Sequence, residues 1–377
     1  MDMAGEQATG PEDSAAGWDV INQVAAGVYG SQEPRHFGAV ISYRLGGNDP
    51  LDGISIYRSE GVNGSLPHWH YLTFGFSDLY GDDQEEAGEV QDGETPASGY
   101  GFELTFRLAI DASDSDEPPA WPMNFLQNIA RYVFETGNVF APGHWMTANG
   151  PIKAGADTLI TEMAFVTDPQ FAAVQGPYGE VQFLQVVGLT QAELNEAKRW
   201  NARGLLQALQ SHTPLWVTDL KRPSLHALPE VQAAIAEGSA REGSSTGVLY
   251  GGELTLQREK RLLRGETITI TIGALLVRDL IALLPCRLPH GKQLTATSDD
   301  FALVITPVPS GLNTEWEDAH TLVLHMGLEP LEALLGAIQP REGEYAVPGM
   351  ERITWQVRRS EILAPDGSVQ EIFGAVQ

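Results

Sequence analysis

The chain has 377 residues, of which 42% are hydrophobic, and this length suggests two domains with separate cores. Fifty acidic residues against 23 basic ones give a formal net charge of −27. Such a surface repels phosphate backbones and anionic lipids, which argues against nucleic-acid and membrane-surface roles. No run of about 18 apolar residues occurs, so the sequence predicts no transmembrane helix.

The net charge has two interpretations. High charge keeps a protein soluble, whatever the protein does. It also attracts a basic partner, such as a basic toxin or peptide, and speeds the encounter with it. The sequence alone leaves both open.

The N-terminus and the cysteine content indicate a compartment. Residues 1–16 have neither a basic n-region nor an apolar h-region, so we expect a disordered lead-in and no signal peptide. Cys286 is the single cysteine, which excludes an internal disulfide and fits a reducing environment. We therefore expect a cytoplasmic protein.

The first elements in chain order are two strands and a helix. Residues 69–76 and 102–108 are rich in aromatic and β-branched side chains and predict strands. The acidic, glycine-containing segment 82–98 between them predicts a loop. Apolar residues recur at helical spacing over 121–135, and Gly137 predicts the end of that helix.

The next elements alternate between strands and helices. Thr190 and Glu193 have the spacing of a capping box and predict a helix that runs to about residue 210. Another helix is expected to open at Pro229 and to close at Gly238. Strands are predicted at 159–166, 181–188 and 215–220.

The small, polar and glycine-rich segment 239–252 is the best candidate for a linker. Beyond it, strands are predicted at 267–272, 301–308, 321–326 and 352–357, with a helix at 328–338. Neighbouring strands with segregated helices predict an α+β fold: two domains, each a mostly antiparallel or mixed sheet packed with helices. The expected division is a lead-in at 1–16, domains at 17–238 and 253–363, the linker between them, and a tail at 364–377.

One cluster of residues raises the question of catalysis. His68 and His70 flank Trp69, and alternate residues of a strand share one face, as in some metal sites. A zinc site needs a third protein ligand, for which Asp78 or Glu103 would have to serve. The alternative is that both histidines are structural. No nucleophile elbow, Walker loop, dinucleotide fingerprint or HExxH motif occurs, so we expect no enzyme and no cofactor or metal.

Several segments resemble the Suppressor of fused family. The likeness is specific in the first domain and looser in the second, and it covers about residues 17–360. The segments that carry it are HWHYLTFGFSDLYG (68–81), SGYGFELTFRL (98–108), PAWPMNFLQNIARYVF (119–134), 167–187, 189–206, WVTDLKR (216–222), 286–305 and HTLVLHMGLEPLEALL (320–335).

The resemblance implies a two-domain mixed α/β protein without catalytic activity. Animal members sequester transcription factors by gripping an extended peptide in the cleft between the domains. Bacterial members are associated with polymorphic toxins and are proposed as immunity proteins, and the composition of this chain resembles theirs. Two binding roles follow as expectations, immunity against a toxin and sequestration of a native regulator. A third expectation is an enzymatic one, a metal-dependent hydrolase that uses His68 and His70.

The resemblance also implies which residues contact the partner. Two aromatic positions correspond to the wall of the cleft, and one short segment corresponds to the backbone that pairs with the peptide. Where animal members place an aspartate, the run Ala141-Pro142-Gly143-His144 has a histidine, so a different partner sequence is expected. The predicted partner-binding residues are Tyr132, Phe140, His144, Gly247, Val248 and Tyr250.

Overall fold

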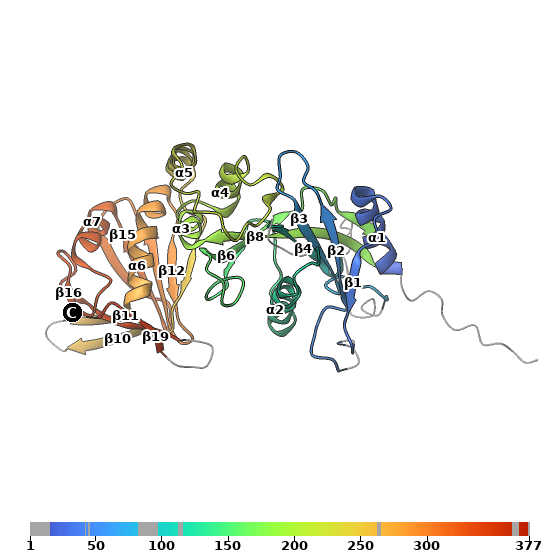
Figure 1. Cartoon of the computed structure of the whole chain (residues 1–377). Coiled ribbons are helices and arrows are strands. Elements are labelled where there is room, and N and C mark those ends of the chain that lie inside the picture. Colours follow the sequence, from blue (N-terminus) through green and yellow to red (C-terminus); the bar gives the residue numbers. More distant parts are fainter. Residues whose placement is uncertain are drawn as a thin grey trace, which may run out of the picture. The chain divides into compact units, whose positions relative to one another are not determined.

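The computed structural model describes residues 16–41, 43, 46–81, 97–111, 116–261, 265–363 and 369–375 (Figure 1). The chain divides into two compact units. Unit 1 comprises residues 1–194 and 206–231, and unit 2 comprises residues 195–205 and 232–377. Among the described residues, no helix has both the length and the apolar character that crossing a membrane requires.

Unit 1 is built on one mixed sheet with the strand order β1-β2-β3-β4-β8-β6-β5, and β7 pairs with β8. Strands β4 and β8 are parallel, whereas the other pairs are antiparallel. The strands are β1 (Arg35–Gly38), β2 (Gly53–Ser59), β3 (His68–Phe74), β4 (Ala97–Ala109), β5 (Trp145–Thr147), β6 (Ile160–Thr167), β7 (Val174–Gly176) and β8 (Gly179–Thr190). The strands predicted at 69–76, 102–108, 159–166 and 181–188 are thus present with small shifts.

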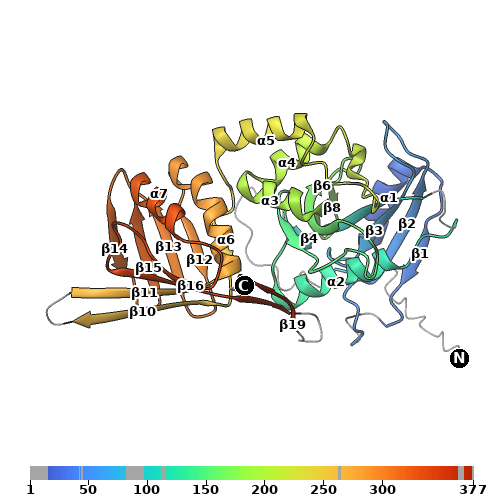
Figure 2. The same ribbon diagram turned by 60° about the vertical axis from the view of Figure 1, so that its left-hand side comes forward.

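Both faces of this sheet are covered, which explains why β3 is buried along its whole length. Helix α2 (Trp121–Thr136) packs on one face, where Ile56 and Phe106 belong to the same apolar cluster as Leu126. Helix α1 (Ala16–Tyr29) packs on the other face, where its Ile21 contacts a cluster that contains Tyr57. Figures 1 and 2 both show α1 beside β1 and β2. Gly137 ends α2 as predicted, with φ 71°.

The predicted capping box is present, but the helix that follows it is interrupted. Thr190 Oγ1 accepts the Glu193 N–H (3.2 Å), and Glu193 Oε2 accepts the Thr190 N–H (2.9 Å). Helix α3 (Gln191–Arg199) then stops, and α4 (Ala202–Leu209) begins after Asn201. The Asn201 side chain accepts the Gly204 N–H (2.6 Å), as a helix N-cap does.

The prediction of a strand at 215–220 is wrong, because these residues form no strand in the structure. A 3₁₀ turn, η3 (Pro214–Trp216), occupies its start, with φ 57° at Leu215 and 48° at Trp216. Only Thr218 keeps a strand-like contact, an isolated bridge to Leu108. Helix α5 (Pro229–Glu242) opens at Pro229 as predicted and continues one turn past Gly238.

Unit 2 contains a four-stranded sheet, β10-β11-β17-β16, and a five-stranded sheet, β14-β15-β13-β12-β9. Each sheet mixes parallel and antiparallel pairs. The strands are β9 (Val248–Tyr250), β10 (Leu254–Arg261), β11 (Gly265–Gly273), β12 (Leu294–Thr297), β13 (Ala302–Pro307), β14 (Leu312–Trp316), β15 (Thr321–Met326), β16 (Gly343–Ala346) and β17 (Ile353–Arg358). All four strands predicted here are present.

One apolar core joins the two sheets of unit 2. It contains Ile270 and Trp355 from the first sheet, Leu303 and Leu324 from the second, and side chains of the helices α6 (Ala274–Leu283) and α7 (Leu328–Ala337). Short 3₁₀ turns, η4 (Leu284–Cys286) and η5 (Leu288–His290), follow α6. A separate hairpin joins β18 (Ser360–Leu363) to β19 (Val369–Phe373). The fold is therefore a mixed α+β architecture, as predicted.

The predicted domain boundaries stay a prediction, but several of the segments have structure. The predicted linker 239–252 holds the last turn of α5 and strand β9, and β19 lies in the predicted tail. Residues 195–205, expected in the first domain, belong to unit 2. The lead-in before residue 16 and the acidic loop at 82–96 lie outside the described residues.

Candidate functional site

Strand β9 is the last strand of the five-stranded sheet in unit 2. It pairs in parallel with β12, where Thr295 donates its N–H to the Gly247 carbonyl and Gly251 donates its N–H to the Thr297 carbonyl (both 2.9 Å). Backbone groups of alternate strand residues point to opposite sides, so those of Val248 and Tyr250 point away from β12. Among the described residues no strand pairs with that side. Strand β9 is therefore an open sheet edge.

The side chains of β9 alternate sharply in exposure. Leu249 is 6% exposed and belongs to the core of unit 2, whereas Val248 and Tyr250 are 61% and 66% exposed. The Tyr250 hydroxyl donates a hydrogen bond to Asp299 (2.8 Å), which fixes the ring at the surface. The strand is thus anchored through one side chain and presents two others.

The segment before β9 is held in place by cationic side chains. Arg287, only 7% exposed, donates from its guanidinium to the carbonyls of Ser244 and Gln293 (both 2.7 Å). Lys292 Nζ donates to the carbonyls of Glu242 (2.6 Å) and Ser244 (3.2 Å). Ser244 is itself fully buried, so residues 243–247 are fixed to unit 2 and do not have the exposure expected of a flexible linker.

In unit 1, the predicted residues Tyr132, Phe140 and His144 lie close together. The rings of Tyr132 and Phe140 are tilted, with centroids 5.8 Å apart, and Phe140 stacks on Phe165 at 4.0 Å. His144 is exposed and immediately precedes β5, and its carbonyl accepts the Phe165 N–H (3.0 Å). The structure therefore groups these three on unit 1 and places Gly247, Val248 and Tyr250 on unit 2. Their role in binding stays a prediction.

This part of unit 1 is also a sheet edge with a pocket next to it. Strand β5 is the last strand on the sheet path and pairs only with β6 among the described residues. A cavity of about 470 Å³ lies elsewhere in the unit, and one of about 360 Å³ lies here, between α2 and β5. Met146 and Thr147 line the nearer cavity, together with Asn124 and Asn128 of α2. It offers apolar and amide surface to a side chain that reaches past β5.

His68 and His70, the candidate metal ligands, are fully buried in β3. His70 Nδ1 bonds the Tyr29 hydroxyl (2.7 Å), its Nε2 is 3.3 Å from Asp168, and His68 Nδ1 bonds the Leu66 carbonyl (2.7 Å). The Arg107 guanidinium also contacts Asp168 (2.7 Å), so the charge of that carboxylate is already paired with a cation. Among the described residues, no three His, Cys, Asp or Glu side chains are placed to hold a metal ion.

The environment also keeps both imidazoles neutral. Burial, together with the nearby Arg107 charge, lowers the pKa of His68 to about 4 and that of His70 to about 3. The two carboxylates considered as a third ligand have other partners. Asp78 accepts the N–H groups of Tyr80 and Gly81, and Glu103 accepts bonds from Thr73, Gly75 and Ser77. The arrangement favours a structural role for the histidines.

Two features of the site were missed from the sequence. The edge strand β5 and its pocket are absent from the predicted elements, because three residues are too short to show a period. The second feature is Arg287, for which the sequence predicted no role. The sequence did contain a signal for its role, namely a basic residue within the apolar run IALLPCRLPHG. An arginine buried in such a run requires hydrogen-bond acceptors, such as backbone carbonyls.

The geometry defines a class: a mixed α+β protein with two units, each of which ends a sheet in an open edge strand. Comparisons identify the family. A sequence profile described as Suppressor of fused protein (SUFU) matches residues 47–223. The human Suppressor of fused homolog is 39% identical over 220 residues, which cover 56% of this chain and 44% of the human protein, and the mouse homolog gives the same values. This chain therefore spans less than half the length of the curated relatives.

Solved structures extend the match. The crystal structure of Drosophila Suppressor of Fused is 25% identical with a TM-score of 0.73, over 93% of this chain and 98% of that one. A chain in the Sufu-Fu complex crystal structure is 35% identical with a TM-score of 0.53, over 59% of this chain and 98% of that one. The protein belongs to the Suppressor of fused family.

Proposed function

We propose that this protein is a non-enzymatic binding protein that holds an extended segment of a partner polypeptide by strand addition at β9. The observation that carries the proposal is the open edge, where the N–H and C=O groups of Val248 and Tyr250 point away from β12. An added strand gains main-chain hydrogen bonds there, and side-chain pockets select its sequence. Because Arg287 fixes the preceding segment, the edge is ordered before the partner arrives.

The Tyr132–Phe140 surface of unit 1 is a further contact for the partner in this proposal, as the family resemblance implies. The exposed His144 beside β5 replaces the acidic group of animal members, so a basic anchor residue is not favoured there. The cavity between α2 and β5 suits an apolar side chain of the partner.

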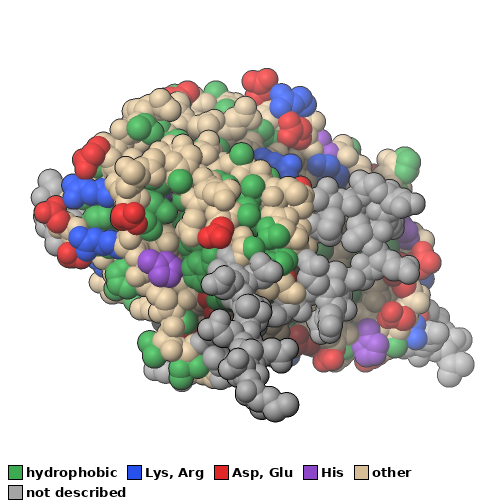
Figure 3. Space-filling view, turned by 90° about the vertical axis from the view of Figure 1, so that its right-hand side faces the viewer, with side chains coloured by type: hydrophobic (Ala, Val, Ile, Leu, Met, Phe, Trp, Pro, Cys, Tyr) green, Lys and Arg blue, Asp and Glu red, His purple; other side chains and the backbone are tan. Residues whose placement is uncertain are grey.

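The biological role we propose is that of a bacterial immunity protein that occludes a basic toxin inside the cytoplasm. The net charge of −27 supports it, because it complements a basic partner. On the face shown in Figure 3, acidic side chains lie scattered, several of them beside Lys or Arg side chains, so the attraction comes from the net charge and not from one acidic patch on this face. That a relative has been solved in a Sufu-Fu complex supports partner binding, and it equally supports the second candidate, sequestration of a native regulatory protein. A toxin-like reading frame next to the gene would separate the two roles.

Substitution of the β9 edge tests the proposal. Val248→Pro removes an outward N–H without touching the core. A matched control is Thr314→Pro in β14, the opposite edge strand of the same sheet, where the alternation of hydrogen bonds also turns the N–H outward. A pull-down from the native host supplies the partner, and its affinity is then measured for both variants and for Tyr132→Ala.

We expect Val248→Pro and Tyr132→Ala each to weaken binding at least about tenfold, which corresponds to about 1.4 kcal/mol. Thr314→Pro should bind normally, and all three variants should melt near the wild-type temperature. Normal binding by well-folded Val248→Pro would place the interface elsewhere.

A further inference from the structure

Unit 1 has a second open edge, at β1. Register places Phe37 opposite Ile54 and Gly38 opposite Gly53, and Ala39 continues the ladder by donating its N–H to the Asp52 carbonyl (2.8 Å). Since backbone groups alternate in direction, those of His36 and Gly38 point outward. Among the described residues, no strand pairs with the outer side of β1. All four residues of β1 are exposed.

Apolar side chains continue from this edge into the next residues of the chain. Phe37 is 45% exposed, Val40 is 100% exposed and Ile41 is 56% exposed. An open edge strand with apolar neighbours is a template for pairing with another chain, and proteins normally block such edges with charge, proline or a covering loop. Here the apolar side chains are presented beside unpaired backbone groups.

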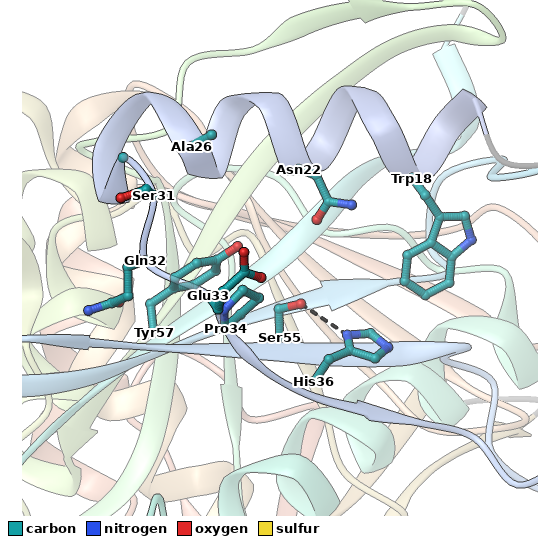
Figure 4. A pocket seen from close by; sticks show the side chains of 11 residues that line it. Trp18, Asn22, Ala26, Ser31, Gln32, Glu33, Pro34, His36, Ser55 and Tyr57 are labelled. Atoms are coloured by element: carbon teal, nitrogen blue, oxygen red, sulfur yellow. Dashed lines mark hydrogen bonds between the residues drawn. The ribbon is translucent and has the colours of Figure 1, made fainter.

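A cavity of about 470 Å³ lies on the α1 side of this edge (Figure 4). Trp18, Asn22 and Ala26 line it from one face of α1. Ser55 and Tyr57, alternate residues of β2, line it from below, and His36 of β1 bonds Ser55 Oγ through Nδ1 (3.0 Å). The volume is in the range of sites that hold a ligand or a large side chain.

The polar groups of the cavity are suited to a cation. The Tyr57 side chain is 4% exposed, yet its hydroxyl has no hydrogen-bond partner among the described residues. Burial and the charge of the nearby Glu33 carboxylate raise the pKa of Tyr57. Glu33 has no ion-pair partner among those residues either, and the described lining contains no Lys or Arg. Burial lowers the pKa of His36, so the imidazole adds no repelling charge at neutral pH.

We propose that β1 and this cavity form a second peptide-binding site, which takes an extended segment by strand addition and receives its arginine side chain. A guanidinium offers several N–H donors in one plane and stacks on aromatic rings, which matches Glu33, the Tyr57 hydroxyl and the Trp18 indole. The net charge of −27 complements such a basic segment. This site is separate from β9 and goes beyond the function proposed above.

The strand register explains how one segment reaches both features. Directly opposed residues of neighbouring strands place their side chains on the same face of a sheet. His36 packs on Trp18 with ring centroids 5.5 Å apart, so its face of β1 is the face that α1 covers. A residue opposite His36 on an added strand would project on this face, next to the imidazole that bonds Ser55 in the cavity wall.

A short designed peptide tests the site. The probe is an N-acetylated, C-amidated Thr-Val-Arg-Val-Thr peptide, and its matched control carries citrulline in place of arginine. Binding is followed by titration calorimetry and by the amide NMR shifts of residues in β1. The protein variants are Glu33→Gln, Tyr57→Phe and Gly38→Pro. Glu135→Gln, at an exposed acid on α2, and Val248→Pro serve as controls.

We expect the arginine peptide to bind with a Kd below about 1 mM and the citrulline peptide to bind about tenfold more weakly. Glu33→Gln and Tyr57→Phe should each weaken binding about fivefold, and Gly38→Pro should abolish the shifts in β1. The two controls should bind normally. Equal binding of the two peptides, no binding at about 1 mM, or binding lost in Val248→Pro would overturn the proposal. If N-acetylarginine amide bound as tightly as the arginine peptide and caused no NMR shifts in β1, strand addition would be overturned. The cavity would then be a binding site for a small cation.

Discussion

Arg107 and Asp168 form a fully buried, two-point ion pair at the centre of unit 1. The guanidinium donates to Asp168 Oδ2 (2.7 Å) and Oδ1 (3.0 Å), and neither side chain has any solvent exposure. Asp168 also accepts the Thr105 hydroxyl (2.6 Å), and Gln185 accepts a further bond from Arg107. The positive charge of Arg107 holds the pKa of Asp168 well below its usual range, against the effect of burial. Asp168 therefore stays ionised at any ordinary pH.

Loss of one partner should therefore be costly. Asp168→Asn leaves the guanidinium buried without an anion, and we expect the free energy of unfolding of unit 1 to fall by about 3–5 kcal/mol. Hydrogen exchange of the amides in β3 and β4 measures this effect in the intact chain. Lys221→Gln is the control, because it removes a surface pair with Asp111 and should cost less than about 1 kcal/mol. Equal losses in the two variants would contradict the expectation.

The buried histidines next to this pair should make unit 1 sensitive to acid. The unfolded chain takes up a proton on His68 below its ordinary pKa of about 6.5, whereas the folded protein does so only near pH 4, because burial lowers the pKa of His68. The unfolded state thus binds more protons between these values, and stability falls as the pH drops through them. At about 1.4 kcal/mol per pKa unit, the loss from His68 approaches about 3 kcal/mol at pH 4.

Glu103 acts in the opposite direction over part of this range. Burial raises its pKa to about 7, so its contribution is present below its ordinary pKa and is lost as the pH rises through 7. The informative quantity is therefore the difference between the wild type and His68→Gln, which keeps a donor for the Leu66 carbonyl. Urea unfolding should show this difference shrinking as the pH falls from about 6.5 to about 4. A difference that stays constant would rule out the neutral, buried imidazole.

The sequence predicts the long elements of this fold well and the short ones poorly. Strand β4 is recognisable by its aromatic and β-branched content because it is buried on both faces, and helix α2 shows a helical period because one of its faces packs on a core. Strand β9 has only three residues, and only the family resemblance pointed to it. Whether β9 is an edge strand depends on the order of all the strands in the sheet. A local sequence pattern does not show that order.

The failed strand at 215–220 shows why such errors occur. Residues 215–217 are apolar or β-branched and look like a strand locally. In the structure the buried amide of Gln185 donates to the carbonyls of Leu215 (2.9 Å) and Trp216 (3.0 Å), and these two residues adopt positive φ. A contact across about 30 positions of the chain thus overrides the local preference. A local sequence pattern cannot predict such a long-range hydrogen bond.

The packing of α5 gives a prediction about glycine. A Cβ on Gly238 would lie 2.1 Å from the Trp200 ring, and one on Gly336 in α7 would meet nothing within 4 Å. Alanine normally stabilises a helix relative to glycine by about 0.5–1 kcal/mol, so Gly336→Ala should raise the melting temperature. Gly238→Ala should lower it, with a loss of about 1–3 kcal/mol, because the ring must move. Stabilisation by both would show that Trp200 moves freely.

The last prediction concerns the rate at which the partner binds. If the charge of −27 steers a basic partner, association should be fast at low salt and slow steeply as ionic strength rises. Screening shortens the reach of the field from about 30 Å at 0.01 M salt to about 8 Å at 0.15 M, while contacts within the interface are affected much less. Stopped-flow measurements should therefore show the association rate changing with salt far more than the dissociation rate. Asp299→Asn beside Tyr250 should reduce the salt dependence more than Glu344→Gln on β16, because only the first charge lies next to the β9 edge. Association rates that do not change with salt would show that the charge serves solubility alone.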